Sequence, residues 1–318
     1  MTDLPLRLPA NWRLPAGFKL SGVNDEGPYF GAAPEDRARL YAEWPEHFEQ
    51  HFKPNIARAR ALGANALRLW NVSPQGVKLG LYSEEHLIGC VRQLALELAK
   101  NDMWFYPCGH YGYRGIAPLT VSELVTWMQM FAPAMAAEPN VMALDLINEG
   151  QYLPESAELV PALVHAVRRA APDLPITVSA QRTEGNFDNN STLDMWNDDA
   201  NFQYLALFDF LDMHPYYTGT PDDARPTYTR TDKPLIVGEY GAPRAVTDRF
   251  RRYQTAATML DHPNCLGIIA WEMIGISSDP AVDFGMFDQR GHDHGDVTPF
   301  FRAGTPVQQS DFGGWRHR

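Results

Sequence analysis

The sequence predicts a (β/α)8 barrel, because short apolar runs and amphipathic helical stretches alternate along most of its 318 residues. Strands that are buried on both faces carry nearly continuous apolar residues. Eight such runs occur, at Phe18–Val23, Ala66–Val72, Trp104–Cys108, Val141–Ile147, Ile176–Ala180, Phe210–His214, Leu235–Gly238 and Gly267–Trp271. Repeated strand–helix alternation favours parallel strands with right-handed crossovers, and eight repeats favour a closed barrel over an open sheet.

Helical stretches lie between most of these runs. Ser83–Lys100 opens with Ser-Glu-Glu, which predicts an N-cap, and carries apolar residues at helical spacing. The other expected helices are Pro45–Leu62, Val121–Ala137, Glu155–Ala171 and Ala245–Asp261. The segment Thr218–Lys233 holds two prolines and little periodicity, so we expect the sixth helix to be short or replaced by a loop.

The length is compatible with one domain, because barrels of this kind take about 250 residues. We expect residues 1–318 to form a single barrel domain whose core spans about 18–275. Residues 276–318 hold many Gly, Asp and His without a convincing last helix, which predicts a loop-rich C-terminal extension.

The composition narrows the classes of partner. A net charge of −12 disfavours nucleic acid and anionic membranes, so neither is expected as a partner. Aromatic residues make up 12% of the chain, with eight Trp, which suits the binding of oligosaccharides or glycosides as well as core packing. The oligomeric state is left open.

The three cysteines, Cys90, Cys108 and Cys265, have no metal-like spacing and are expected to be reduced thiols. The N-terminus MTDLPLRLPANW shows no secretory signal pattern, which favours a cytoplasmic location, although a mature secreted form would look the same.

Polar and aromatic residues gather at the carboxyl ends of the predicted strands, where barrels of this class carry their active sites. In chain order they are Asn24, Asp25, Glu26, Arg68, Trp70, His110, Asn148, Glu149, His214, Tyr216, Glu239 and Trp271. A strand end is often simply the first solvated position, but a purely structural barrel would not need such residues at nearly every strand.

Two carboxylates in this set, Glu149 and Glu239, follow the fourth and seventh strands, which face each other across the barrel mouth. Side chains reaching inward from both sides can bring the two carboxyls about 5 Å apart, the separation needed for double displacement at a glycosidic bond. One carboxyl would attack the anomeric carbon, and the other would protonate the leaving oxygen and later activate water. An ionised nucleophile would raise the pKa of its neighbour and keep that acid protonated.

Two strands carry a family resemblance. The run VMALDLINE, ending in Asn148-Glu149, resembles the Asn-Glu strand of clan A glycoside hydrolases, and LIVGEYG, around Glu239, resembles their nucleophile strand. The closest likeness is to glycoside hydrolase family 5, the cellulase and mannanase family. That family is marked by Arg, His, Asn-Glu, His-x-Tyr, Glu and Trp in this order. Here the set falls on Arg68, His110, Asn148, Glu149, His214, Tyr216, Glu239 and Trp271.

The resemblance implies roles for these residues. Glu149 would be the general acid/base and Glu239 the nucleophile of a retaining β-glycosidase. Arg68 would hold Glu239 ionised, and Tyr216 would donate a hydrogen bond to it. His214 would support the acid/base. In the sugar-binding part of the site, Asn148 would contact the 2-hydroxyl of the reacting sugar, and Trp271 would form the floor of its subsite.

The chain departs from the family pattern at two places. Gly150 follows Glu149 where the family usually has Pro. Asp25 and Glu26 lie outside the family set, and they either hold terminal sugar hydroxyls, as exo-acting enzymes require, or lie in a solvated turn.

Alternative functions are disfavoured. A Schiff-base lyase needs a Lys in the barrel mouth, and none of the five lysines lies at the carboxyl end of a strand. A catalytically inactive carbohydrate-binding barrel commonly lacks one of the two Glu, whereas both are present here. A metal-dependent isomerase would need several His and carboxylates converging in the mouth, whereas His110 and His214 are separated by the strand of Glu149 and the next strand. No cofactor or metal is expected, because retaining hydrolysis needs none, although the Asp- and His-rich segments 279–283 and 292–296 hold groups that can bind an ion. The sugar, its linkage, and endo or exo action are left open.

Overall fold

The computed structural model describes residues 6–28, 39–111, 117–150, 156–181, 206–214, 233–261, 263–275, 277, 279–281, 283–298 and 301. Its strands are β1 (Leu20–Asn24), β2 (Ala66–Leu69), β3 (Trp104–Pro107), β4 (Leu144–Asp145), β5 (Ile176–Thr177), β6 (Ser179–Gln181), β7 (Leu211–His214), β8 (Leu235–Tyr240) and β9 (Cys265–Ala270). Each of the eight predicted strand positions holds a strand, and all pairings between these strands are parallel, as predicted.

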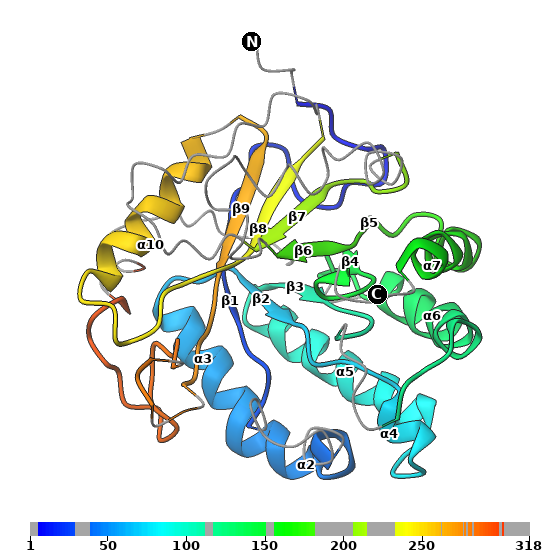
Figure 1. The fold of residues 1–318 in the computed structure, drawn as a ribbon, viewed down its shortest axis with the longest axis horizontal. Coiled ribbons are helices and arrows are strands. Elements are labelled where there is room, and N and C mark those ends of the chain that lie inside the picture. The colour runs from blue at the N-terminus through cyan, green and yellow to red at the C-terminus, as the bar shows by residue number, and fades with distance from the viewer. Residues whose placement is uncertain are drawn as a thin grey trace.

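The strands curl into a closed ring with the helices outside it (Figure 1). Seven strands follow the order β3-β2-β1-β9-β8-β7-β6, and β4 pairs with β5. Parallel bridges from Phe105 to Val141 and from Cys108 to Asp145 join β3 to the fourth strand position. The predicted fold class, an α/β barrel of the TIM type, is therefore confirmed.

The predicted fifth strand is divided into two short strands. Its first half, β5, pairs with β4, and its second half, β6, pairs with β7, so that Val178 lies where the partner changes. This change of partner lets Ser179 face the barrel interior, where its hydroxyl accepts a hydrogen bond from Arg68 Nη2 at 3.4 Å.

The helices are α2 (Trp44–His47), a π-helical turn (Phe48–Phe52), α3 (Lys53–Ala61), α4 (Gln75–Lys78), α5 (Glu84–Lys100), α6 (Val121–Ala136), α7 (Ser156–Ala170), α10 (Arg249–Ala257) and a 3-10 turn (Thr258–Asp261). Ser83 caps α5 as predicted, with its hydroxyl accepting from the His86 N–H. Helix α10 begins later than the predicted Ala245, because Arg244 and Ala245 donate their N–H groups to the loop carbonyls of Asp283 and Pro280. The expected short sixth helix lies outside the described residues.

Apolar packing fills both the barrel interior and the space between strands and helices. The interior layer includes Leu20, Tyr106, Phe210 and Ile236, and the N-terminal segment extends it where Trp12 contacts Phe210 edge to face at 5.6 Å. The described part of the C-terminal extension consists mainly of turns and isolated bridges, and the chain is helical at Thr298 and Phe301. No described helix is long and apolar enough to cross a bilayer. The apolar interior layer, with Trp12 packed against it, fills the N-terminal end of the barrel, and the polar groups gather at the opposite end.

Candidate active site

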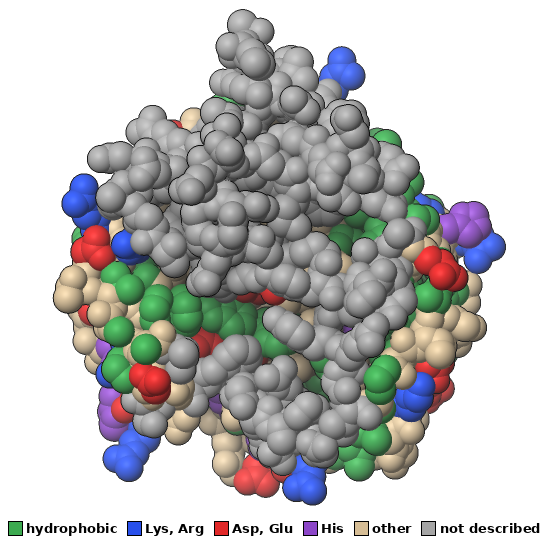
Figure 2. Space-filling view, viewed as in Figure 1, with side chains coloured by type: hydrophobic (Ala, Val, Ile, Leu, Met, Phe, Trp, Pro, Cys, Tyr) green, Lys and Arg blue, Asp and Glu red, His purple; other side chains and the backbone are tan. Residues whose placement is uncertain are grey.

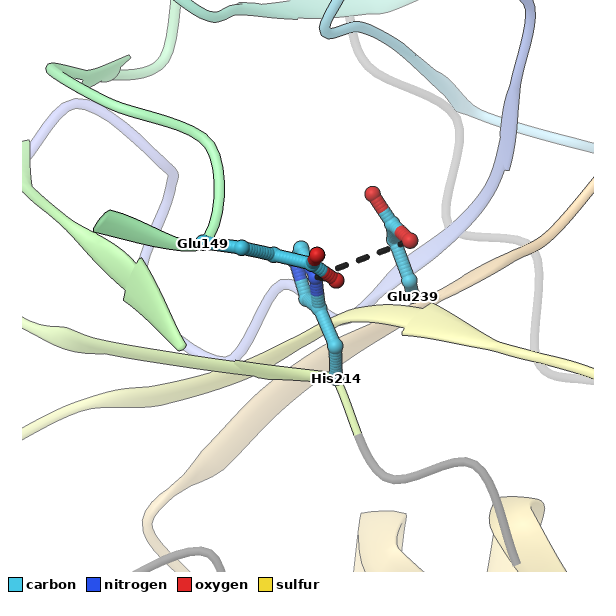
Figure 3. A group of neighbouring side chains, drawn as sticks. All are labelled: Glu149, His214 and Glu239. Carbon is cyan, nitrogen blue, oxygen red and sulfur yellow. Dashed lines mark hydrogen bonds and ion pairs between the residues drawn. The ribbon is translucent and has the colours of Figure 1, made fainter. Parts of the chain in front are cut away.

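The two predicted catalytic glutamates meet at the carboxyl end of the barrel. One carboxylate oxygen of Glu149 and one of Glu239 lie within 4.8 Å of each other, together with a ring nitrogen of His214. His214 Nδ1 is 3.0 Å from Glu149 Oε1 and 3.5 Å from Glu239 Oε2 (Figure 3). Both glutamates are deeply placed, with exposed fractions of 5% for Glu149 and 3% for Glu239.

Arg68, which comes from the centre of β2, is the cation of the site. Its Nη1 donates to Glu239 Oε1 at 2.6 Å, and its Nη2 donates to Asp145 Oδ2 at 2.8 Å. Burial lowers the pKa of the guanidinium, but the charges of Glu239, Asp145 and Asp212 outweigh it and raise that pKa well above its ordinary value. Arg68 therefore stays charged and stabilises the ionised form of Glu239.

His214 ends β7 and is fully buried between the two glutamates. Burial, and then the charge of Arg68, lower the pKa of its imidazole well below the ordinary value, so the ring is neutral at physiological pH. We assign its proton to Nδ1, because the atoms within reach of that nitrogen are carboxylate oxygens. The neutral ring then donates toward the carboxyl pair without adding a charge.

Two buried acids lie behind Arg68 and His214. Asp212 Oδ2 accepts from the Tyr106 hydroxyl at 2.6 Å, and its Oδ1 accepts from the Gly238 N–H at 2.9 Å. Burial raises the pKa of Asp212 to about 8, against the opposing charge of Arg68. Burial also raises the pKa of Asp145. At Gly238 a Cβ atom would lie 2.2 Å from Asp212 Oδ1, so glycine is what allows this carboxyl to reach the backbone.

Asp145, Asp212 and Ser179, which support the site residues, were not predicted from the sequence. Asp145 and Asp212 interrupt otherwise apolar strands, and a charged residue in a strand that is buried on both faces signals a paired interior group. Ser179 carried no comparable signal, because its role depends on the division of the fifth strand. Its hydroxyl accepts the Glu149 N–H at 3.0 Å, and its own N–H donates to Asp145 Oδ1 at 3.0 Å.

The backbone at Glu149 is strained. Its φ is +49°, in the left-handed region that non-glycine residues adopt at a cost of about 1–3 kcal/mol. The next residue is Gly150, and a Cβ there would lie 2.6 Å from Val178 Cγ1, so glycine allows this close approach. The hydrogen bond from Glu149 to Ser179 holds this turn in place.

Two asparagines fix the surroundings of Arg68. Asn148 Oδ1 accepts from Arg68 Nη2 at 2.7 Å, which directs its amide NH2 group away from the guanidinium. Asn24 accepts from Arg68 Nη1 at 3.1 Å and donates to the carbonyls of Gly238 and Ala270, so it ties β1 to β8 and β9. Asn24 is thus placed as a structural link, whereas Asn148 keeps donors for a ligand.

Aromatic rings line the same end of the barrel. Trp70 and Trp271 lie 6.0 Å apart between ring centroids, and Tyr111 contacts Trp70 at 6.2 Å. Together with Cys108 and Phe284 they form a separate apolar cluster. His110 lies beside Tyr111, contacts Ser73 Oγ through Nδ1 at 3.2 Å, and has a pKa lowered by burial to about 4. The rings are nearly buried, with exposed fractions of 2% for Trp70 and 7% for Trp271, and aromatic rings next to polar groups are typical of sugar-binding sites.

Asp25 and Glu26, in the loop after β1, have different surroundings. Asp25 accepts from His51 Nε2 at 2.8 Å and Asn55 Nδ2 at 2.9 Å, and it is buried rather than solvated. The Glu26 carboxyl lies within hydrogen-bonding reach of that of Glu272, the residue after Trp271. Glu272 was not among the predicted site residues. Tyr216 lies outside the described residues.

The glutamate–histidine cluster also has ligand types that can hold a metal ion. Glu239, however, already faces the Arg68 guanidinium at 2.6 Å, so a dication bound there would lie close to a fixed positive charge. The arrangement suits proton transfer and nucleophilic attack better than metal binding. Figure 2 shows acidic side chains at the bottom of a hollow near the centre of one face, bordered by hydrophobic side chains.

Comparisons with known proteins support the fold. No protein-family model matches the chain, and no curated protein matches it in sequence. Among solved structures, an exo-β-1,4-mannosidase from Opitutaceae bacterium strain TAV5 matches with a TM-score of 0.69 and 13% identity over 94% of this chain. The chain spans 62% of that mannosidase.

Two further solved structures resemble it. A variant of a family 5, subfamily 18 glycoside hydrolase from Streptomyces cattleya, in complex with Manβ1-4GlcNAc, has a TM-score of 0.68 at 15% identity, covering 94% of this chain and 81% of its own. A subfamily 18 protein from Bifidobacterium longum subsp. infantis has a TM-score of 0.65 at 17% identity, covering 90% and 78%. The chain therefore has the barrel fold of these glycoside hydrolases.

Proposed function

We propose that the protein is a retaining β-glycosidase with Glu239 as nucleophile and Glu149 as general acid/base. The observation that carries the proposal is the distance of at most 4.8 Å between carboxylate oxygens of the two residues. Retaining enzymes place these groups about 5–5.5 Å apart, whereas inverting enzymes need about 6.5–9.5 Å to admit a water molecule.

In the first step, Glu239 attacks the anomeric carbon and Glu149 gives its proton to the leaving oxygen, which yields a glycosyl ester on Glu239 and a free alcohol. In the second step, Glu149 takes a proton from water, and the resulting hydroxide displaces Glu239 with a second inversion. Arg68 stabilises the carboxylate of Glu239 before attack and as it leaves. Asn148 donates its amide hydrogens to the hydroxyl next to the anomeric carbon.

We further propose a β-mannoside as substrate. This choice rests on the printed names of the neighbours, among them the exo-β-1,4-mannosidase and the subfamily 18 structure with bound Manβ1-4GlcNAc. The aromatic cluster around Trp70 and Trp271 supplies the flat surface that a pyranose ring requires.

The proposal is tested with a panel of aryl β-mannosides, β-glucosides and β-galactosides, following the first-formed product anomer by NMR. We expect cleavage of the mannoside and an initial β-anomer. An initial α-anomer would reject retention, and absence of cleavage across the panel would reject the proposed activity.

The two residues are separated by their variants. We expect Glu149→Ala to hydrolyse an activated aryl glycoside slowly and to recover turnover with azide, which replaces water without needing a base. Azide should not restore wild-type stereochemistry to Glu239→Ala, because that variant lacks the nucleophile. Glu85→Ala, at an exposed position in the first turn of α5, is the control and should match the wild type. Wild-type rates in either catalytic variant contradict the assignment.

A further inference from the structure

A second pair of carboxyls lies next to the proposed nucleophile. Glu272 follows Trp271 at the end of β9, and β9 pairs with β8, which carries Glu239. Glu26 follows β1, which pairs with β9 on its other side. The Glu26 and Glu272 carboxyls lie within hydrogen-bonding reach of each other, and both are buried, with exposed fractions of 3% and 2%.

The surroundings of Glu272 are acidic. Burial, then the charge of Asp283, raises the pKa of Glu272 well above its ordinary value, and Asp25 and Glu239 act in the same direction. Each of these three acids has its own donor: Asp283 has Arg244 at 2.7 Å, Asp25 has His51, and Glu239 has Arg68. No N–H or O–H donor in the described part of the chain reaches Glu272 Oε1.

A hydrogen bond between these two carboxyls uses a shared proton, so that proton is taken up within the pair and the remaining positions are acceptors. A buried acceptor without a donor costs free energy that a ligand hydroxyl can recover. Neighbouring hydroxyls of a sugar ring can each donate to such an acceptor, which matches this set. A cationic ligand is less suited, because the three adjacent acids already have His51, Arg244 and Arg68 as partners.

We propose that Glu26 and Glu272 bind two hydroxyls of the sugar ring that Glu239 attacks, on the side of the ring away from its anomeric carbon. The proposal rests on the proposed function. Because both side chains are buried, we expect this end of the site to accept free hydroxyls rather than a further sugar. The pair therefore selects the non-reducing terminal residue, and the enzyme acts from the chain end.

The test uses binding, which does not depend on turnover. The Kd of D-mannose and of its 3-, 4- and 6-deoxy analogues is measured by NMR titration for the wild type, Glu272→Gln and Glu26→Gln. For the wild type, we expect one or two analogues to bind about 10- to 100-fold more weakly than mannose, as a lost hydrogen bond to a charged group predicts. In the Gln variants, that discrimination should largely disappear.

The control is Glu138→Gln, a buried glutamate paired with Arg92 away from the barrel mouth, which should discriminate as the wild type does. Full discrimination in both mouth variants, or none in the wild type, overturns the proposal. If one Gln variant fails to fold, the other decides. Failure of the proposed function is seen separately, as absence of aryl glycoside cleavage by the wild type.

Discussion

Two pairs of glutamates occupy the same barrel mouth and differ in what surrounds them. Glu149 and Glu239 lie within reach of His214, and Glu239 faces Arg68. Glu272 has acids as its electrostatic neighbours, and the carboxyl of another acid, Glu26, lies within hydrogen-bonding reach. An ionised nucleophile needs a fixed cation, whereas hydroxyl recognition needs acceptors without one. The same residue type is thus suited to covalent chemistry in one pair and to binding in the other.

The largest effect should come from removing the nucleophile. Glu239→Ala is expected to lower kcat on an aryl β-mannoside by at least about 10⁴-fold, because loss of a covalent nucleophile is seldom compensated. Glu272→Gln should lower kcat/KM much less, by the 10- to 100-fold that a hydroxyl contact provides. Steady-state kinetics on both variants measures the two losses. Equal losses would contradict the different roles of the two glutamate pairs.

Arg68 is expected to dominate the stability of the catalytic pair. Arg68→Met leaves Glu239 and Asp145 without their buried cation, which should cost about 3–5 kcal/mol in the free energy of unfolding. Urea denaturation at pH 7 measures this loss. Lys53→Met, at an exposed pair with Glu49, is the control and should cost under about 1 kcal/mol. Equal losses for the two variants contradict the role of Arg68.

Two acids of the first and last loops should respond to pH with opposite signs. Burial opposes ionisation of Asp25, but the electrostatic interaction with His51 and the hydrogen bonds with His51, Asn55 and Gly27 leave the pKa of Asp25 lowered. Its contribution to stability is therefore present above its unfolded pKa. The pKa of Glu272 is raised, so its ionisation costs stability as the pH rises above its unfolded pKa.

At pH 8, Asp25→Asn should therefore lower the free energy of unfolding by about 1–3 kcal/mol, while Glu272→Gln should raise it. At pH 4 the gain from Glu272→Gln should vanish, because the wild-type carboxyl is then protonated in both states. Chemical denaturation at both pH values checks the signs, and two changes of the same sign refute the contrast.

The smallest effect should come from Ser179. Ser179→Ala removes the acceptor for the strained Glu149 N–H and is expected to cost about 1–2 kcal/mol of stability and to lower kcat several-fold. KM should change little, because Ser179 acts through the position of Glu149. Ser122→Ala on the exposed face of α6 serves as control. A normal kcat in Ser179→Ala would show that this turn keeps its geometry without the hydroxyl.

Much of the fold could be predicted from the sequence, because local patterns determine it. Apolar runs marked the eight strand positions, and Ser83 marked the start of α5. The division of the fifth strand at Val178 could not be predicted, since it depends on which neighbours the strand meets in the ring.

The site residues that lie at the carboxyl ends of strands could be predicted from the sequence. Arg68, Glu149, His214 and Glu239 were named from their positions, and they lie together. Their pairing was not predictable from local pattern, because the Arg68–Glu239 contact joins residues 171 positions apart. The partner of Glu26, Glu272, was hidden for the same reason, and the left-handed backbone at Glu149 leaves no composition signal.

The central claim is tested most directly by trapping the covalent intermediate with a 2-deoxy-2-fluoro-β-mannosyl fluoride, followed by peptide mass spectrometry. The fluorine slows both steps and the fluoride leaves readily, so the glycosyl ester should accumulate. The account predicts one fluorosugar per chain, attached to Glu239, in the wild type. A label on any other residue, or an enzyme that turns over β-mannosides but never becomes labelled, would contradict it.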